Sequence, residues 1–330
     1  MTALPIIEEL HQSAAEIATL QQEIRDLARR RKAVIIAHNY QRPEIQDVAD
    51  FVGDSLGLSR KAAAVEQDVI VFCGVHFMAE TAAILAPEKR VLLPDLRAGC
   101  SLAATITAED VQRWKAKFPD YIAVGYVNTT AAVKAELDYC CTSGNVLDVI
   151  DAIPQDKGIL FCPDFFLGAH VRRMRPHRKV EVWLGECHVH RDINPHTLDR
   201  VRHEHPEAEV LVHPECGCAG QLIYAMGRGD IPTEGVHIAS TERMVNLTRE
   251  RPTKEFIVAT ETGIMHRMQQ LNPGKKFYAA DPEAVCAFMK TITLPNVREA
   301  LTLDRYHVTV PPDVANRARG ALDRMVALGR

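Results

Sequence analysis

Nine short runs of apolar, often β-branched residues recur along the chain, and they limit the folds open to it. A run that is apolar at every position fits a parallel strand buried on both faces, whereas a half-buried strand alternates apolar and polar residues. Helical patterns lie between most of the runs, as in residues 43–64 and 108–118. Strand, helix and strand in succession predict an α/β fold with parallel sheets and right-handed crossovers. The runs read AVIIAHNY, VIVFCGV, RVLLPDL, YIAVGYVN, ILFCPD, VEVWLG, EVLVHPE, GVHIAS and EFIVAT.

Three of these runs recur at a fixed spacing. Ile35, Ala123 and Leu211 occupy matching positions in their runs and lie 88 residues apart. Each of the three runs ends in polar residues two positions apart, whose side chains therefore leave the strand on the same side. These pairs are His38 with Tyr40, Tyr126 with Asn128, and His213 with Glu215.

Hydroxyl and thiol groups follow the same repeat. Ser55 and Ser143 are also 88 residues apart, and each lies in a stretch typical of a helix start or a tight turn. The step Ser240–Thr241 follows in the third unit, somewhat later than the repeat would place it, which indicates an insertion around residues 219–235. A cysteine comes late in each unit, and the second cysteine spacing is longer in the same way. These cysteines are Cys100, Cys187 and Cys286.

The repeat predicts three similar αβα units with parallel sheets, arranged about a pseudo-threefold axis around a central active site. We place the units at residues 1–107, 108–195 and 196–299, and expect residues 300–330 to pack back on the first unit. Ligands of open α/β sheets bind at the carboxyl ends of the strands. The polar pairs, hydroxyls and thiols of all three units should therefore meet in one cavity.

Composition and charge argue against several classes of protein. The net charge of −4 leaves no large electropositive field for nucleic acid. No apolar run reaches the roughly 18 residues of a membrane span, and the first 32 residues lack the pattern of a signal peptide. No G-x-G-x-x-G motif follows a predicted strand, which argues against a Rossmann dehydrogenase. We expect a cytoplasmic protein with no nucleic acid or membrane partner, whose nine cysteines are reduced.

Three thiolates delivered by three units suit an iron–sulfur cluster or zinc. Zinc sites usually draw on local pairs such as C-x₂-C, and the chain has none. A [4Fe–4S] cluster is wide enough to join distant segments, and with three protein thiolates one iron keeps an open position for Lewis-acid chemistry. Two alternatives stay open here: a non-catalytic iron–sulfur redox sensor and a zinc-dependent hydrolase. The zinc ligands would be His188, His190, His213 and Glu215.

The remaining polar residues indicate anion binding and proton transfer. Ser55 and Ser143 could hold a phosphate or carboxylate beside backbone N–H groups, although each serine taken alone fits a plain helix N-cap better. Glu215 is a candidate general acid or base, and its alternative is a surface carboxylate. Tyr40 and Tyr126 could donate protons or pack as core aromatics.

Several longer stretches resemble the quinolinate synthase family, in the family's order and over nearly the whole chain. The resemblance implies condensation of iminoaspartate with dihydroxyacetone phosphate to give quinolinate, phosphate and water, a step of NAD biosynthesis. It also implies an L-aspartate oxidase or dehydrogenase as the source of the imine. The stretches are AHNYQRPEIQDVADFVGDSLGLS, FCGVHFMAETAAIL, LLPDLRAGCSLA, GYVNTTAAVKA, CTSGN, GECHVH, VHPEC, ETGIMHR and MKTITL.

The resemblance assigns roles residue by residue. It implies a [4Fe–4S] cluster held by Cys100, Cys187 and Cys286, with the fourth iron open to substrate. It implies catalytic roles for Tyr40, Tyr126, His213 and Glu215. The substrate-binding residues that it implies are His38, Ser55, Tyr126, Asn128, Ser143, His190, His213, Glu215, Thr241 and Met289.

Cys216 and Cys218 flank one glycine in VHPECGCAG. They follow a strand end, and three other cysteines already occupy the repeat positions, so we interpret the pair as packing residues and not as cluster ligands. A redox-sensitive pair is the alternative. Some relatives also carry C-x-x-C-x-x-C around the third ligand, whereas Cys286 stands alone in CAFMKTI.

Overall fold

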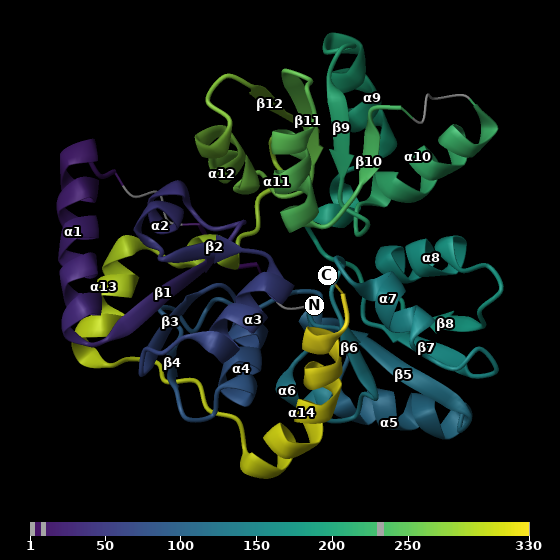
Figure 1. The fold of residues 1–330 in the computed structure, drawn as a ribbon, viewed down its shortest axis with the longest axis horizontal. Coiled ribbons are helices and arrows are strands. Elements are labelled where there is room, and N and C mark those ends of the chain that lie inside the picture. Colours follow the sequence, from purple (N-terminus) through teal and green to yellow (C-terminus); the bar gives the residue numbers. More distant parts are fainter. Residues whose placement is uncertain (1–3, 8–10, 230–233, 330) are drawn as a thin grey trace.

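The computed structural model describes residues 4–7, 11–229 and 234–329. Within them lie three four-stranded parallel sheets, with strand orders β2-β1-β3-β4, β6-β5-β7-β8 and β10-β9-β11-β12. In each sheet the second strand along the chain lies at one edge, followed by the first, third and fourth strands. This shared strand order confirms the predicted threefold repeat of α/β units. Figure 1 shows the three sheets set around a common centre, with helices packed on both sides of them. The unit boundaries at 107, 195 and 299 stay a prediction.

The strands of the first two sheets are mostly buried on both faces. Strands β3 and β7 are buried at every position, as continuous apolar runs between covering helices require. The first unit contains α1 (Ala14–Arg30), β1 (Ala33–His38), α2 (Pro43–Val48), β2 (Phe51–Gly53), α3 (Ser55–Ala64), β3 (Val69–Cys73), α4 (His76–Leu85), β4 (Arg90–Leu92) and the 3₁₀ helix η1 (Ala103–Thr105). The second contains α5 (Ala108–Lys117), β5 (Tyr121–Tyr126), α6 (Ala131–Lys134), β6 (Tyr139–Cys141), α7 (Val146–Asp151), β7 (Gly158–Cys162), α8 (Phe165–Met174), β8 (Val180–Val182) and η2 (His190–Asp192).

The third unit repeats the pattern and is followed by two further helices. Its insertion falls around α10, and residues 230–233 of the predicted insertion lie outside the described residues. The elements are α9 (Pro195–Glu204), β9 (Glu209–Val212), α10 (Gly217–Arg228), β10 (Val236–Ile238), α11 (Thr241–Glu250), β11 (Glu255–Ala259), α12 (Ile264–Leu271), β12 (Lys276–Ala279), η3 (Met289–Thr291), α13 (Leu294–Leu303) and α14 (Pro312–Ala327).

The repeat extends to single hydrogen bonds. The backbone N–H of Ile35 donates to Asp50 Oδ2 over 2.7 Å, and the N–H of Ala123, 88 residues later, donates to Asp138 Oδ2 over 2.8 Å. Each aspartate directly precedes the edge strand of its sheet and links the start of that strand to the first strand of the unit. The same spacing therefore reproduces the same contact.

Three strands have no counterpart among the nine apolar runs. Strands β2 and β6 are three residues long and pair only with the first strand of their sheet, so their sequence carries little apolar signal. Strand β12 is the edge of the third sheet and is not fully buried. Residues 43–64, which read as one helical stretch, are divided into α2, β2 and α3.

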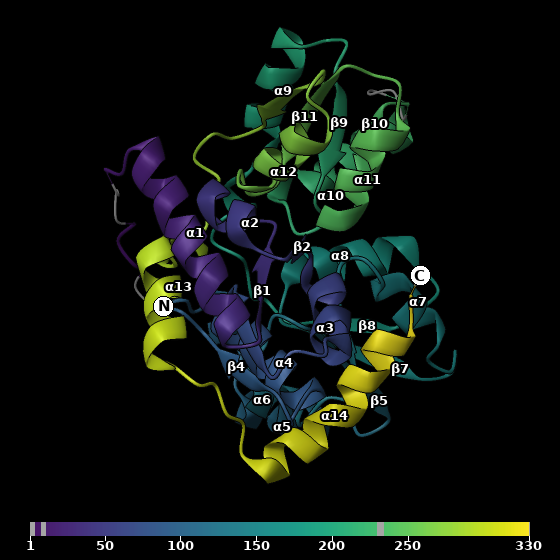
Figure 2. The same cartoon turned by 60° about the vertical axis from the view of Figure 1, so that its left-hand side comes forward.

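The last two helices pack on the first unit, and α14 also contacts the second. Helix α13 packs against α1 and β3 of the first unit, and α14 contacts α3, α4, α6 and β6. Figure 2 shows α14 running along the junction between the first and second units. The Asn145 amide donates to the backbone oxygens of Met325 and Leu328 over 2.9 Å and 2.8 Å, which fixes the end of α14 to the loop before α7.

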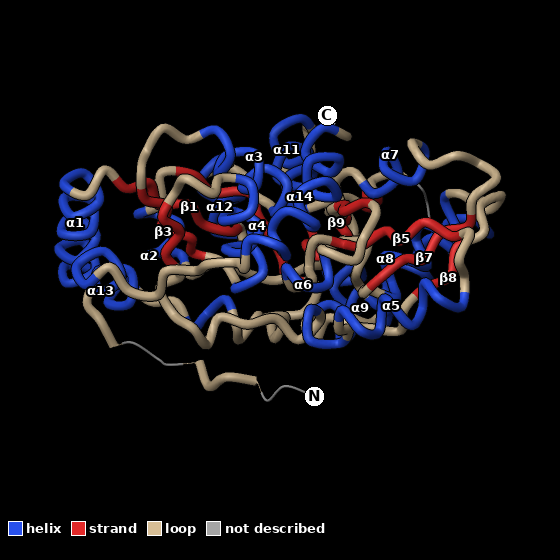
Figure 3. The backbone as a smooth tube through the Cα atoms, turned by 90° about the horizontal axis from the view of Figure 1, so that it is seen from below, coloured by secondary structure: helices blue, strands red, loops and turns tan. Residues whose placement is uncertain are grey.

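Seen from below in Figure 3, helices lie on both sides of the strands. Among the described residues, no helix combines the length and the apolar character needed to cross a membrane.

Candidate active site

A cavity lies where the three units meet. All of the residues predicted as site residues from the sequence line it. The first unit contributes His38, Tyr40, Ser55 and Cys100; the second Tyr126, Asn128, Ser143, Cys187 and His190; the third His213, Glu215, Thr241, Cys286 and Met289.

Two strand ends present a histidine in the same way. The Tyr40 backbone N–H donates to His38 Nδ1 over 3.1 Å, and the Glu215 N–H lies 3.5 Å from His213 Nδ1. Since Nδ1 accepts in both cases, Nε2 carries the proton of the neutral ring. His213 Nε2 lies 3.1 Å from Ser143 Oγ, whereas His38 has an N–H available to a ligand.

The histidines of the cavity are uncharged near neutral pH. Burial, helped by the nearby Lys290 ammonium, lowers the pKa of His38 to about 3. Burial also lowers the pKa of His190 to about 3 and takes the pKa of His213 well below its usual range. These rings therefore act as neutral hydrogen-bond partners.

Two helices begin at the cavity with a hydroxyl residue. Ser55 is the first residue of α3 and Thr241 is the first residue of α11, while Asp54 and Ser240 are the N-caps. The N-cap interpretation of Ser55 is therefore wrong, because the Asp54 carboxylate already accepts the Gly57 N–H. The Ser55 hydroxyl and the amino ends of both helices can instead bind an anion.

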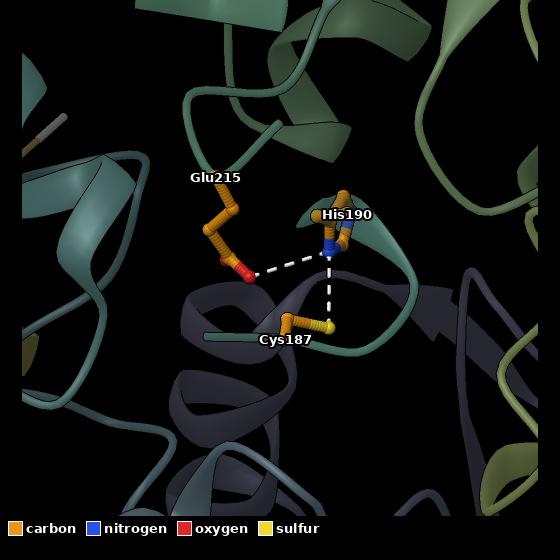
Figure 4. Close-up of side chains that lie close together, drawn as sticks. All are labelled: Cys187, His190 and Glu215. Atoms are coloured by element: carbon orange, nitrogen blue, oxygen red, sulfur yellow. Dashed lines mark hydrogen bonds and ion pairs between the residues drawn. The ribbon is translucent and has the colours of Figure 1, made fainter. Parts of the chain in front are cut away.

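Glu215 is the central carboxylate of the cavity and is only 2% exposed. Its Oε1 accepts a hydrogen bond from the Tyr126 hydroxyl. Its Oε2 lies 3.4 Å from His190 Nδ1, and Figure 4 shows the side chains of Glu215, His190 and Cys187 pointing toward one another. Burial raises the pKa of Glu215 to about 7, and the Tyr126 hydrogen bond opposes that rise. A carboxyl group with this pKa is suited to general acid–base catalysis at neutral pH.

The substitution Tyr126→Phe is expected to move the pH dependence of activity upward. A base works in its ionised form, so activity that depends on Glu215 should rise as the pH passes through about 7. Removing the Tyr126 hydroxyl deletes the hydrogen bond that lowers the pKa of Glu215. Profiles of kcat/KM against pH should show the rising limb at higher pH in the variant. An unmoved limb would contradict the pairing.

Each of the three predicted ligand cysteines begins the same backbone turn. The carbonyls of Cys100, Cys187 and Cys286 accept the N–H four residues later, over 3.2, 3.0 and 3.1 Å. The 3₁₀ helices η1, η2 and η3 start three residues after these cysteines. The N–H of that third residue is directed at the sulfur, and for Cys100 the N···Sγ distance is 3.5 Å. Backbone N–H donors favour the thiolate form, which suits a metal cluster.

Burial opposes ionisation of the same thiols when no metal is bound. It raises the pKa of Cys100 to about 11 and of Cys286 to about 12. It also raises the pKa of Cys187 well above its usual range, helped by the charges of Glu215 and the other two cysteines. Three thiols that line one pocket, one from each unit, fit a group that binds thiolates and displaces their protons.

The zinc alternative is not assembled as predicted. His190, His213 and Glu215 lie together, but His188 Nδ1 is 2.7 Å from Ser101 Oγ and bonds outside this set. In the described part of the chain, one group of three potential metal ligands lies within 4.8 Å, and it consists of Cys187, His190 and Glu215.

Gly185, two residues before Cys187, fixes the path of the ligand loop. A Cβ at this position would overlap the backbone oxygen of Pro163 and the Thr105 hydroxyl. We expect Gly185→Ala to destabilise the protein by about 1–3 kcal/mol, measured as a lower unfolding midpoint. The control is Gly220→Ala in α10, where a Cβ meets nothing within 4 Å and a gain of about 0.5–1 kcal/mol is expected. Equal midpoints for the two variants would disprove the overlap.

Sequence reasoning missed three polar residues beside the cavity, namely Thr260, Glu261 and Lys290. Thr260 and Glu261 directly follow β11, and Lys290 lies in η3. Polar residues after a strand were considered only for the first strand of each unit, and the same signal at the third strand would have found Thr260 and Glu261.

Cys216 and Cys218 are buried free thiols at the start of α10. Cys216 Sγ donates to the Ala259 backbone oxygen over 3.0 Å. Burial, and the neighbouring Cys218 after it, raise the pKa of Cys216 well above its usual range. Thiols with raised pKa values react slowly with oxidants, which favours the packing interpretation.

Comparison with known proteins identifies the family of the chain. Residues 22–327 match the model of the family described as quinolinate synthetase A protein. The chain belongs to this family. Quinolinate synthases of Mycobacterium sp. (strain KMS) and Thermus thermophilus are 52% and 54% identical to it, over 93% and 94% of this chain and 91% and 97% of theirs. The enzyme of Mycobacterium tuberculosis is 50% identical over 93% of this chain and 88% of its own.

The match to the quinolinate synthetase A family spans all three units. It starts within α1 and ends at the last residue of α14, so every element that lines the cavity lies inside it. The resemblance noted in the sequence is thereby confirmed over the whole fold.

Proposed function

We propose that the chain is a quinolinate synthase, an enzyme of NAD biosynthesis that condenses iminoaspartate with dihydroxyacetone phosphate. The products are quinolinate, phosphate and water. The observation that carries the proposal is the convergence of three equivalent cysteine turns, one from each unit, on a cavity that also holds the buried Glu215.

The cavity suits two anionic substrates without a cationic side chain in its described wall. Iminoaspartate carries two carboxylates and the triose carries a phosphate. Neutral donors can bind these groups: the Ser55 and Thr241 hydroxyls at helix starts, the His38 Nε2–H and the Asn128 amide. Asn128 Oδ1 is buried with no partner within the described protein, so it can accept a hydrogen bond from a donor group of the ligand, such as an imine N–H or a hydroxyl.

Protons must leave the carbon that forms the new bond and must reach the leaving oxygens. Glu215, with its pKa near 7, is placed to accept a proton and return it. The Tyr126 hydroxyl is bonded to that carboxylate. Tyr40 lines the same cavity on the other side of His190, with its hydroxyl 3.3 Å from His190 Nε2.

Cys100, Cys187 and Cys286 would hold a [4Fe–4S] cluster with three protein ligands. Such a cluster supplies one iron with an open position, which acts as a Lewis acid on a substrate oxygen. The protein side chains bind and orient the substrates, exclude water and move protons. The nine free cysteines fit a reducing, cytoplasmic location. An L-aspartate oxidase or dehydrogenase would supply the unstable imine.

The test is anaerobic purification followed by metal, sulfide and activity assays. The proposal predicts roughly four irons with matching sulfide per chain and formation of quinolinate from iminoaspartate and dihydroxyacetone phosphate. One zinc per chain and no sulfide would support a hydrolase instead. A cluster without turnover would support a redox sensor.

A further inference from the structure

Asn39 and Thr241 form a hydrogen bond between the first and third units, directly behind the wall of the cavity. Asn39 follows β1, is fully buried and does not line the cavity, whereas Thr241 begins α11 and does line it. The Asn39 Nδ2 group lies 3.2 Å from Thr241 Oγ1. The Asn39 backbone is fixed on both sides, because its N–H donates to the Gly53 backbone oxygen over 3.0 Å and its backbone oxygen accepts from the Gln46 amide over 3.1 Å. The side-chain amide therefore reaches Thr241 from a fixed position.

Arg267 determines which end of the Asn39 amide faces Thr241. Arg267 Nη1 lies 2.8 Å from one end of that amide. A guanidinium group only donates hydrogen bonds, so the amide atom that faces it must be the oxygen Oδ1. The NH₂ end then faces Thr241, whose Oγ1 accepts the hydrogen bond. Among the residues that the structure describes, none accepts the hydrogen of the Thr241 hydroxyl, so this hydrogen can be donated to a ligand in the cavity.

A salt bridge holds Arg267 in this orientation. Its Nη1 lies 2.7 Å from Glu242 Oε2, and its Nη2 lies 3.1 Å from Glu242 Oε1. This two-point contact joins α12 to the first turn of α11 and fixes the plane of the guanidinium group. Glu242 also compensates the charge of Arg267. What reaches the cavity is therefore the direction of a hydrogen-bond chain, which runs from Arg267 through Asn39 to the Thr241 hydroxyl.

We propose that Asn39, oriented by Arg267, is a positioning residue that directs the hydrogen of the Thr241 hydroxyl toward an anionic oxygen of the bound substrate. This inference rests on the proposed function, in which both substrates carry such oxygens, on carboxylates or on a phosphate. No lysine or arginine belongs to the described wall of the cavity. The orientation of neutral donors therefore decides whether the cavity attracts an anion, and hydrogen bonds to charged groups are the stronger ones.

The test compares Asn39→Asp with Asn39→Ala. Aspartate has nearly the shape of asparagine, but both of its oxygens accept, so the oxygen that faces Thr241 takes the hydroxyl hydrogen away from the ligand. Alanine only removes the restraint on the hydroxyl. We expect the affinity for the anion to fall about 10- to 100-fold in Asn39→Asp and to fall less in Asn39→Ala. A residue that only fills space would give the opposite order.

A double substitution separates the hydrogen bond from the added charge. In a Thr241→Val background the aspartate can act only through its charge, so most of the loss caused by Asn39→Asp should disappear. Asn39→Ala should cost nothing further in that background, because the hydroxyl that it releases is already absent.

Binding is measured by calorimetry on the anaerobic enzyme with its cluster. Inorganic phosphate is the probe for a phosphate group, and malonate is the probe for a pair of carboxylates. The anion whose dissociation constant rises shows which group of the substrates meets Thr241. In steady-state assays the KM of the matching substrate should rise by the same factor, while kcat changes less.

The matched control is Asn272→Asp. Asn272 makes the same kind of contact further along α11, where its Nδ2 donates to Thr248 Oγ1 over 2.9 Å, and neither residue lines the cavity. This variant should be less stable but should keep both anion affinities. It therefore separates the loss of an oriented donor in the cavity from the general cost of placing a carboxylate beside a buried hydroxyl.

The inference is overturned if Asn39→Asp binds both anions as tightly as the unsubstituted enzyme, if Asn39→Ala binds them more weakly than Asn39→Asp, or if Asn39→Asp costs as much with valine at position 241. Failure of the unsubstituted enzyme to bind either anion would also overturn it. If Asn39→Asp does not fold, the loss in Asn39→Ala and its disappearance in the Thr241→Val background decide the question. Binding is measured without turnover, so a protein that forms no quinolinate refutes the proposed function separately.

Discussion

Protein carrying Cys187→Ala is expected to be colourless and to form no quinolinate. Cys187 is the only predicted ligand of the second unit, and its backbone turn matches those of Cys100 and Cys286. Alanine leaves two thiolates, which cannot hold a cluster that needs three protein ligands. Because the Lewis-acid iron belongs to that cluster, activity should disappear along with the absorption in the visible range. Iron and sulfide analysis, absorption spectra and a quinolinate assay on anaerobic protein measure the effect.

The control is Cys73→Ala. Cys73 is fully buried at the end of β3, and it does not line the cavity. Its loss removes a similar volume from the core without touching the site, so colour and activity should be kept. An active, colourless Cys187→Ala variant would refute the role of the cluster. A brown variant with full iron content would refute the ligand assignment.

The second large effect is expected from Glu215→Gln. Glutamine keeps the size of the side chain and can still bond the Tyr126 hydroxyl, but it cannot take up a proton. Loss of a general acid or base typically lowers the rate about 10²- to 10⁴-fold, and we expect kcat to fall in this range. Steady-state kinetics measures the loss, and iron and sulfide contents should be unchanged because Glu215 is not a predicted ligand of the iron–sulfur cluster.

Glu209→Gln is the matched control, since Glu209 lies on β9, the strand that ends just before the Glu215 loop. Its carboxylate bonds Arg251 and His237 on the outside of the third unit. This variant should keep its kcat. If the kcat of Glu215→Gln is as high as that of Glu209→Gln, other groups carry out the proton transfer.

The arrangement of the site was largely predictable from the sequence because the fold repeats. Once Ile35, Ala123 and Leu211 are recognised as equivalent, the chemistry of parallel sheets places the residues after them at one central point. The pairs His38 with Tyr40 and His213 with Glu215 line the cavity, but β1 ends at His38 and β9 at Val212. The turn after each strand, and not the two-residue period of the strand, therefore positions the later residues. The assignment of a role to Met289 needed the resemblance, since its residue type alone does not indicate a ligand.

What the sequence did not reveal has physical reasons. Strands β2 and β6 pair on one side only and are too short for a periodic signal. The Glu261–Lys290 pair joins residues far apart in sequence, and no spacing rule relates a carboxylate after one strand to an ammonium in a later 3₁₀ helix. Asp54, and not Ser55, is the N-cap of α3. The sequence does not show which of two adjacent capping residues leaves the helical conformation.

Because α13 packs on α1 and β3, the first unit cannot complete its folding in the order in which the chain is synthesised. The strands of the first sheet leave the ribosome before those of the second and third sheets, yet Leu294, Val297 and Leu301 of α13 belong to the hydrophobic core beside them. Until those residues are translated, part of the earliest sheet has no apolar cover. Nascent chains that already contain the second and third units would thus still expose the flank of the first, and chaperones would find their binding surface at the beginning of the chain and not at its growing end.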